Sequence, residues 1–212
     1  EHPRHDVLLQ KVRLGKALVS NAQWLEFIAD GGYTTPSLWL SDAWAVVQSE
    51  GWQAPGYWRE RDGQWFSLTL AGEKPINPQS VVCHISYYEA DAFARWAGAR
   101  LPSEAEWESF AESADPYLGN QLDEAAAVLP KPGGGVFGDA WEWTASAYLA
   151  YPGFAPAEGA VGEYNGKFMS GQFVLKGASC ATPRAHSRAS SRNFFPPAAR
   201  WQFSGLRLAR DS

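Results

Sequence analysis

The sequence has 212 residues, 45% of them hydrophobic and 19% charged, and a formal net charge of −5. This composition is typical of a globular chain and excludes a disordered one, and no apolar run approaches the roughly 20 residues of a membrane helix. Eight basic and no acidic residues lie between positions 164 and 210. Because they are spaced singly among aromatic residues and prolines, we expect no nucleic-acid binding.

The first half of the chain predicts short elements separated by turns. Residues 6–9 look like a strand. Ser20 and Gln23 form a capping box that starts a helix, which Gly31-Gly32 ends. A second helix is expected from Ser41 to about Glu50, followed by a hairpin over 56–70 with its turn at 61–63.

A short strand is expected at residues 81–85, and two helices follow closely. Their capping boxes pair Ser86 with Glu89 and Ser103 with Glu106. Residues 113–175 contain no long periodic element, and strands are expected at 174–176 and 205–209. The sequence therefore predicts one loop-rich α+β domain over 1–212, with Trp24, Trp96, Trp107, Trp141 and Trp143 around one core.

Four separated motifs resemble the formylglycine-generating-enzyme, or sulfatase-modifying-factor, fold. They are His84-Ile85-Ser86-Tyr87-Tyr88-Glu89-Ala90, Gly98 to Glu108, Phe137-Gly138-Asp139-Ala140-Trp141-Glu142-Trp143-Thr144, and Gly205-Leu206-Arg207-Leu208-Ala209. The resemblance implies a C-type-lectin-like α+β domain. Formylglycine-generating enzymes bind copper through two closely spaced cysteines, and Cys83 and Cys180 are far apart, so that chemistry is disfavoured.

A narrower resemblance is to the C-terminal half of the ergothioneine sulfoxide synthases. It rests on segments that include Glu1 to His5, Tyr151-Pro152-Gly153-Phe154, Ser179 to Pro183 and Arg192 to Pro197. These non-haem iron enzymes use oxygen to join the sulfur of cysteine or γ-glutamylcysteine to trimethylhistidine. Their iron is held by an N-terminal helical domain with an HxxxHxE motif, which we expect to lie outside this chain. The start at Glu1 suggests a fragment or a processed product.

Two positions depart from the synthase pattern. Ser191 stands where the family commonly has Tyr, and Ala178 interrupts a usual Gly-Gly-Ser. A non-catalytic ligand-binding module on the same fold, or a scaffold without a ligand, therefore stays open as an alternative.

The resemblance places trimethylhistidine at the loop that contains Asn193, Phe194 and Phe195. A quaternary ammonium group is bound through aromatic faces, and an amide suits a carboxylate or an imidazole. Packing in the core is the alternative for both phenylalanines. Arg188, Arg192 and Arg200 are candidates for a substrate carboxylate, with internal ion pairs as their alternative.

Metal ligands are sparse. None of the four histidines lies in an HxxxH pair, so we expect iron(II) in the parent enzyme but not on these residues. Asp139 and Glu142 are candidates for a structural calcium ion.

His84 is expected to be buried and satisfied by the backbone, Arg207 to be structural, and both cysteines to be free. We expect a cytoplasmic protein, since the sequence shows no signal peptide.

Overall fold

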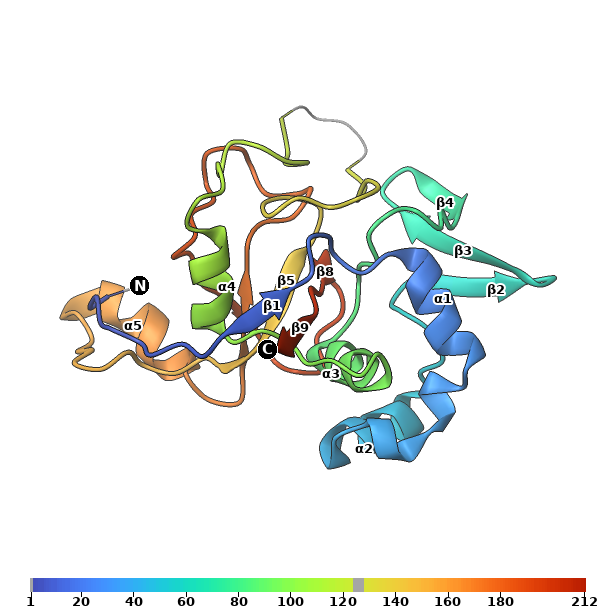
Figure 1. The fold of residues 1–212 in the computed structure, drawn as a ribbon, viewed down its shortest axis with the longest axis horizontal. Coiled ribbons are helices and arrows are strands. Elements are labelled where there is room, and N and C mark those ends of the chain that lie inside the picture. Colours follow the sequence, from blue (N-terminus) through green and yellow to red (C-terminus); the bar gives the residue numbers. More distant parts are fainter. Residues whose placement is uncertain (1, 124–127) are drawn as a thin grey trace.

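The computed structural model describes residues 2–123 and 128–212 (Figure 1). Its five α-helices within these residues are α1 (Asn21–Ala29), α2 (Ser41–Glu50), α3 (Tyr87–Trp96), α4 (Glu104–Ala111) and α5 (Gly162–Asn165). The strands are β1 (Val12–Leu14), β2 (Trp58–Arg61), β3 (Gln64–Thr69), β4 (Gly72–Pro75), β5 (Trp141–Ala147), β6 (Phe173–Lys176), β7 (Asn193–Phe195), β8 (Ser204–Gly205) and β9 (Ala209–Asp211). The architecture is α+β and loop-rich, as predicted.

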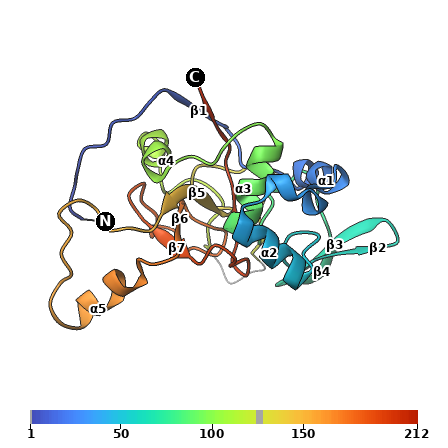
Figure 2. The ribbon, with the colours of Figure 1, turned by 90° about the horizontal axis from the view of Figure 1, so that it is seen from below.

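The strands form three small sheets. β1 pairs with β9, β2, β3 and β4 form a meander, and the largest sheet has the order β7-β6-β5-β8. All pairings are antiparallel except that of β5 with β8, which is parallel. The meander lies beside α1 at one end of the molecule, and α5 lies at the other end (Figures 1 and 2).

All three predicted capping boxes are present. In each, the serine side chain accepts a hydrogen bond from the backbone of the third helical residue, whose side chain accepts one in return. The predicted hairpin is β2–β3, and its turn residues Asp62 and Gly63 both have positive φ, at 52° and 76°. This is the backbone twist that a two-residue hairpin needs.

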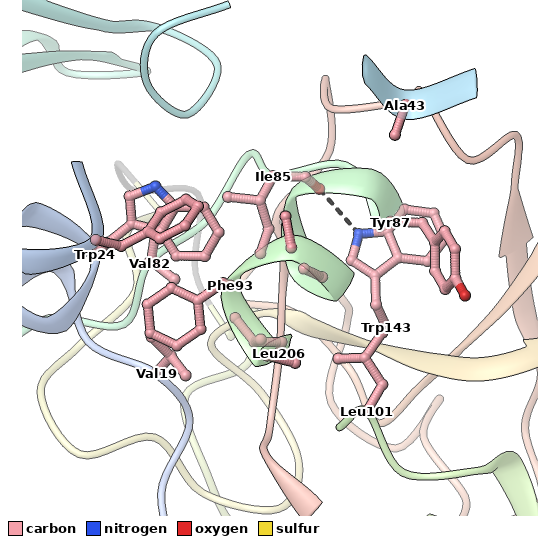
Figure 3. Close-up of a cluster of buried hydrophobic side chains, with 14 of the residues drawn as sticks. Val19, Trp24, Ala43, Val82, Ile85, Tyr87, Phe93, Leu101, Trp143 and Leu206 are labelled. Atoms are coloured by element: carbon pink, nitrogen blue, oxygen red, sulfur yellow. Dashed lines mark hydrogen bonds between the residues drawn. The ribbon is translucent and has the colours of Figure 1, made fainter. Parts of the chain in front are cut away.

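Aromatic side chains fill the core. Trp24 stacks on Phe93 with ring centroids 4.8 Å apart, and Phe27 meets Phe93 edge-on at 5.5 Å. Trp143 donates its indole N–H to the carbonyl of Ile85 at 2.9 Å, the bond drawn in Figure 3. Trp24, Trp107 and Trp143 are fully buried, as predicted, whereas Trp96 and Trp141 are only half-buried. The prediction of one core was wrong for Trp107, which packs with Phe137 in a separate cluster.

Three strand predictions were wrong in position. Residues 6–9 form no strand, with Leu8 89% exposed, and the pairing begins at Val12 instead. Residues 81–85 make only an isolated bridge at Val81, because the chain turns at His84, where φ is 62°. The segment 205–209 is divided between β8 and β9.

None of the helices in the described part of the chain is both long and apolar enough to cross a bilayer.

Candidate functional site

The segment Asn193–Phe195 is a strand, β7, and not the loop that the sequence analysis expected. It pairs with β6 and forms one edge of the largest sheet, with Phe195 opposite Phe173 and Asn193 opposite Leu175. Because side chains alternate along a strand, Asn193 and Phe195 share one face and Phe194 lies on the other.

The two phenylalanines accordingly have different neighbours. Phe194 stacks on Tyr148, with centroids 4.0 Å apart and planes at 10°. Phe195 packs against the core and meets Trp201 edge-on at 5.1 Å. Trp201 is 62% exposed. The structure therefore does not bring both rings to one ligand, and Phe195 with Trp201 forms the more accessible aromatic pair.

Asn193 faces the same side as Phe195 and is half-buried. Its side-chain oxygen accepts the N–H of Phe194 at 2.9 Å. This local bond fixes the orientation of the amide, so that its nitrogen is the atom that can donate to a ligand.

Arg192, next to β7, is held by an acid and two aromatic rings. Its Nε lies 2.7 Å from Oε1 of Glu104, and Nη2 donates to Oε2 at 3.1 Å. The guanidinium carbon lies 4.7 Å from the Tyr148 ring centroid and 4.2 Å from that of Tyr151. Its side chain is only 6% exposed. Arg192 therefore makes the internal ion pair that was the alternative to binding a substrate carboxylate.

Tyr151 completes this arrangement by donating its hydroxyl to Glu104. Burial, and then the hydrogen bond to the Glu104 carboxylate, raises the pKa of Tyr151. The Tyr151 phenol therefore stays protonated. Its hydrogen bond helps to fix the Glu104 carboxylate, which in turn binds Arg192.

Arg200 also contacts internal groups. Its guanidinium lies 4.3 Å from the Trp52 ring centroid and 3.6 Å from Oε1 of Glu89, and it donates to the Ala54 carbonyl. Glu89 is fully buried and also accepts the Tyr33 hydroxyl at 2.6 Å. Of the three arginine candidates, Arg188 is the exposed one.

From the sequence, Glu104, Glu106 and Glu108 were interpreted as a helix cap and a solvated face. Glu106 caps α4 as predicted, but Glu104 is buried and not solvated. Glu104 and Glu106 are buried, and Glu106 binds both terminal nitrogens of Arg100 at 2.8 Å. Glu108 lies 3.0 Å from Lys176, whose side chain is fully buried. Burial lowers the pKa of Lys176, while Glu108 raises it in part.

The two calcium candidates, Asp139 and Glu142, accept hydrogen bonds from other groups of the protein. Oδ1 of Asp139 accepts Nδ2 of Asn120 and the backbone N–H of Lys131, both at 2.7 Å. Glu142 is bound by Arg207 through both oxygens at 2.9 Å. Both carboxylates therefore already accept hydrogen bonds from the protein, and the calcium site stays a prediction. Arg207 is structural, as predicted.

Within residues 2–123 and 128–212, no three His, Cys, Asp or Glu side chains converge as metal ligands. His84 is buried and hydrogen-bonded to the backbone of Gln202 and Trp201, as predicted, although its Nδ1 has no hydrogen-bond partner. Cys83 and Cys180 are free, and burial raises the pKa of each thiol. These residues do not fit an iron centre.

Sequence reasoning missed several residues around β7. Glu104 was interpreted as part of a helix cap and solvated face, and Tyr148 and Trp52 were given no role in the site. Trp201 was considered only as an aromatic near the Asn193-Phe194-Phe195 loop in sequence. Tyr151 was noted only within a motif of the resemblance.

Comparison with known proteins gives a consistent assignment. The sulfatase-modifying factor enzyme 1-like domain matches residues 1–127 and 134–212. The hercynine oxygenase of Mycobacterium tuberculosis is 37% identical, over 100% of this chain and 55% of that protein. Ergothioneine biosynthesis protein 1 of Schizosaccharomyces pombe is 25% identical, over 100% of this chain and 27% of that protein. The chain spans about half the length of the hercynine oxygenases that it matches.

A similar fold occurs in solved structures. PvdO from Pseudomonas aeruginosa superposes with a TM-score of 0.60 at 19% identity, covering 100% of this chain and 85% of that one. Treponema denticola variable protein 1 gives 0.55 at 15% identity, covering 95% and 84%. At these identities the likeness concerns the fold alone. The sequence motifs, the loop-rich α+β architecture and the family match agree, and the chain belongs to the sulfatase-modifying factor enzyme 1-like domain family.

Proposed function

We propose that this chain is the substrate-binding, C-terminal part of an iron- and oxygen-dependent sulfoxide synthase. The reaction would join the thiol of cysteine or γ-glutamylcysteine to trimethylhistidine, which is hercynine. Support comes from relatives named hercynine oxygenase that match over the whole of this chain at 36% identity or more.

The observation that carries the proposal is the anchoring of β7 beside an exposed aromatic ring. Main-chain pairing with β6 fixes Asn193 and Phe195 on one face, next to Trp201. Aromatic faces suit the trimethylammonium group, and the Asn193 amide suits the carboxylate or the imidazole. Because Arg192 is held by Glu104, the strand needs little reorganisation to receive the ligand.

The role proposed for these residues is to bind and orient hercynine. Iron and oxygen would supply the oxidising chemistry, but the described residues do not fit an iron centre. We therefore assign iron to a helical domain with an HxxxHxE motif, separate from residues 1–212. If substrate binding and iron binding are divided in this way, the isolated chain should form no sulfoxide. Adding such a helical domain in trans should restore sulfoxide formation. Tight one-to-one iron binding with turnover by the chain alone would contradict it.

The binding test is calorimetry with hercynine and histidine, which share the imidazole and the carboxylate. We expect hercynine to bind more tightly. Phe195→Ala should weaken hercynine binding by about 0.5–2 kcal/mol, the usual range of a cation–π contact. Phe194→Ala is the matched control, since the same truncation on the opposite face of β7 should leave the affinity nearly unchanged.

Equal affinities for the two ligands would argue against a trimethylammonium site and favour a binding module for another ligand. An effect of Phe194→Ala alone would move the site to the Tyr148 face of the sheet.

A further inference from the structure

A second site is suggested by a cavity that adjoins the candidate site on β7 at Trp201. It has a volume of about 370 Å³ and lies between the β2–β4 meander and the segment that precedes β8. Its aromatic walls are Tyr57, Trp58, Trp201 and Phe203. Cavities of about 300–1,000 Å³ with mostly apolar walls and a few polar groups are the usual sites for small molecules.

Two residues in the cavity wall have an unusual backbone. Tyr57 and His84 both have positive φ, at 66° and 62°, in the region that favours glycine. Their rings meet edge-on at 4.8 Å, and the N–H of Gly56 donates to the His84 carbonyl at 2.8 Å. Neither residue is a glycine, so the surrounding structure holds both in a costly conformation that places their side chains at the cavity.

His84 is also an incompletely satisfied polar group. Its side chain is 8% exposed, its ring contacts Phe203 at 4.7 Å, and Nδ1 is buried without a hydrogen-bond partner. A buried polar atom of this kind costs free energy unless a ligand or water satisfies the ring. Burial lowers the pKa of His84 to about 4, so the imidazole is neutral at neutral pH.

The charge of the cavity determines the ligand class. None of the described residues that line it is Asp or Glu, and Lys74 supplies the formal positive charge. Arg200 lies near enough to His84 to oppose protonation of the imidazole. A cationic ligand would therefore find aromatic faces but no balancing carboxylate, whereas an anionic group could pair with Lys74.

We propose that this cavity binds a small aromatic carboxylate, with its ring against Trp201, Phe203 and His84 and its carboxylate at Lys74. The site would take a different class of ligand from the hercynine site, since hercynine carries a quaternary ammonium group. Trp201 lies at both places, since it lines the cavity and also contacts Phe195 on β7.

The test uses three probes with the same ring and different charge: indole-3-acetate, indole-3-acetamide and tryptamine. Calorimetry on residues 1–212 should give the tightest binding for the acetate and the weakest for tryptamine. Lys74→Gln should weaken binding of indole-3-acetate by roughly 2- to 5-fold, the range of an exposed charge pair. The affinity for indole-3-acetamide should stay unchanged. Lys16→Gln, an exposed lysine outside the cavity, is the matched control and should leave the order intact.

NMR of the imidazole groups locates the probe. Indole-3-acetate should shift the ring signals of His84 and leave those of His2, His5 and His186 in place. Signal assignment uses His84→Asn, because Asn tolerates positive φ, and the Lys74 comparison does not depend on that variant. Absence of binding at millimolar concentration or tightest binding of tryptamine would each overturn the proposal.

Discussion

Arg192 and Glu104 lie 88 positions apart in the sequence and form an ion pair at 2.7 Å, with side chains only 6% and 10% exposed. Removing one partner of such a pair leaves the other charge buried. The pair joins the first turn of α4 to the residue before β7, so it connects the helical layer to the edge of the largest sheet.

Glu104→Ala should lower the free energy of unfolding by about 3–5 kcal/mol, because the Arg192 guanidinium stays buried without its acid. Urea unfolding measures the change. The control is Glu163→Ala, which removes an ion pair with Lys167 whose side chains are 71% and 59% exposed. That variant should lose less than about 1 kcal/mol. Equal losses in the two variants would show that the Arg192 pair contributes no more than a surface pair.

Lowering the pH should destabilise the protein through His84, whose pKa is lowered to about 4 by burial. The contribution is fully present above the ordinary pKa of about 6.5. As the pH falls from there toward 4, the unfolded state takes up the proton first, and stability falls by up to about 3 kcal/mol.

The measurement is urea unfolding across that pH range in the wild type, His84→Asn and His186→Asn. His84→Asn should flatten the dependence, and His186→Asn, which replaces an exposed histidine, is the control for the substitution itself. A dependence that His84→Asn does not reduce would assign the loss to other groups.

Glu142, Arg207 and Trp107 form one buried network. Oε2 of Glu142 accepts the Trp107 indole N–H at 2.7 Å and Nε of Arg207 at 2.9 Å. Glu142→Ala should cost about 3–5 kcal/mol. The double variant Glu142→Met/Arg207→Met should cost less than this single change, since no lone charge is buried. Urea unfolding compares the two, and a double variant that unfolds more readily than the single one would mean that the ion pair itself stabilises the fold.

The capping boxes should differ in strength. Ser86 is fully buried and donates its hydroxyl to Glu89 at 2.8 Å, whereas the Ser20 cap is exposed. Each serine-to-alanine change should cost about 0.5–2 kcal/mol, with Ser86→Ala at the upper end because Glu89 loses a donor away from water. Thermal unfolding compares them, and a larger shift for Ser20→Ala would contradict this order.

Local signals predicted the local structure. Each capping box needs only four consecutive residues, and the hairpin turn at Asp62-Gly63 needs two. The sequence therefore indicated where α1, α3 and α4 begin and where β2 turns into β3.

Strands that pair over long distances were predicted less well. β7 has three residues before two prolines, and its pairing with Phe173–Leu175 cannot be read from its own composition. The interpretation of Glu104 as a surface residue failed for the same reason, because its partner is 88 positions away. The family resemblance supplied the fold and directed attention to Asn193, but the alternation that separates Phe194 from Phe195 appears only with the strand.

The pairing of β1 with β9 places a constraint on the order of folding. Val12 pairs with Asp211 and Leu14 with Ala209. β1 therefore cannot pair until the ribosome has synthesised β9, almost two hundred residues later. Loop closure over such a distance is slow, and a nascent chain folds only with the residues that have left the ribosome. Until residues 209–211 emerge, Arg100 also lacks the backbone bonds that it exchanges with Ala209. The last step of assembly therefore falls after most of the core residues are already available.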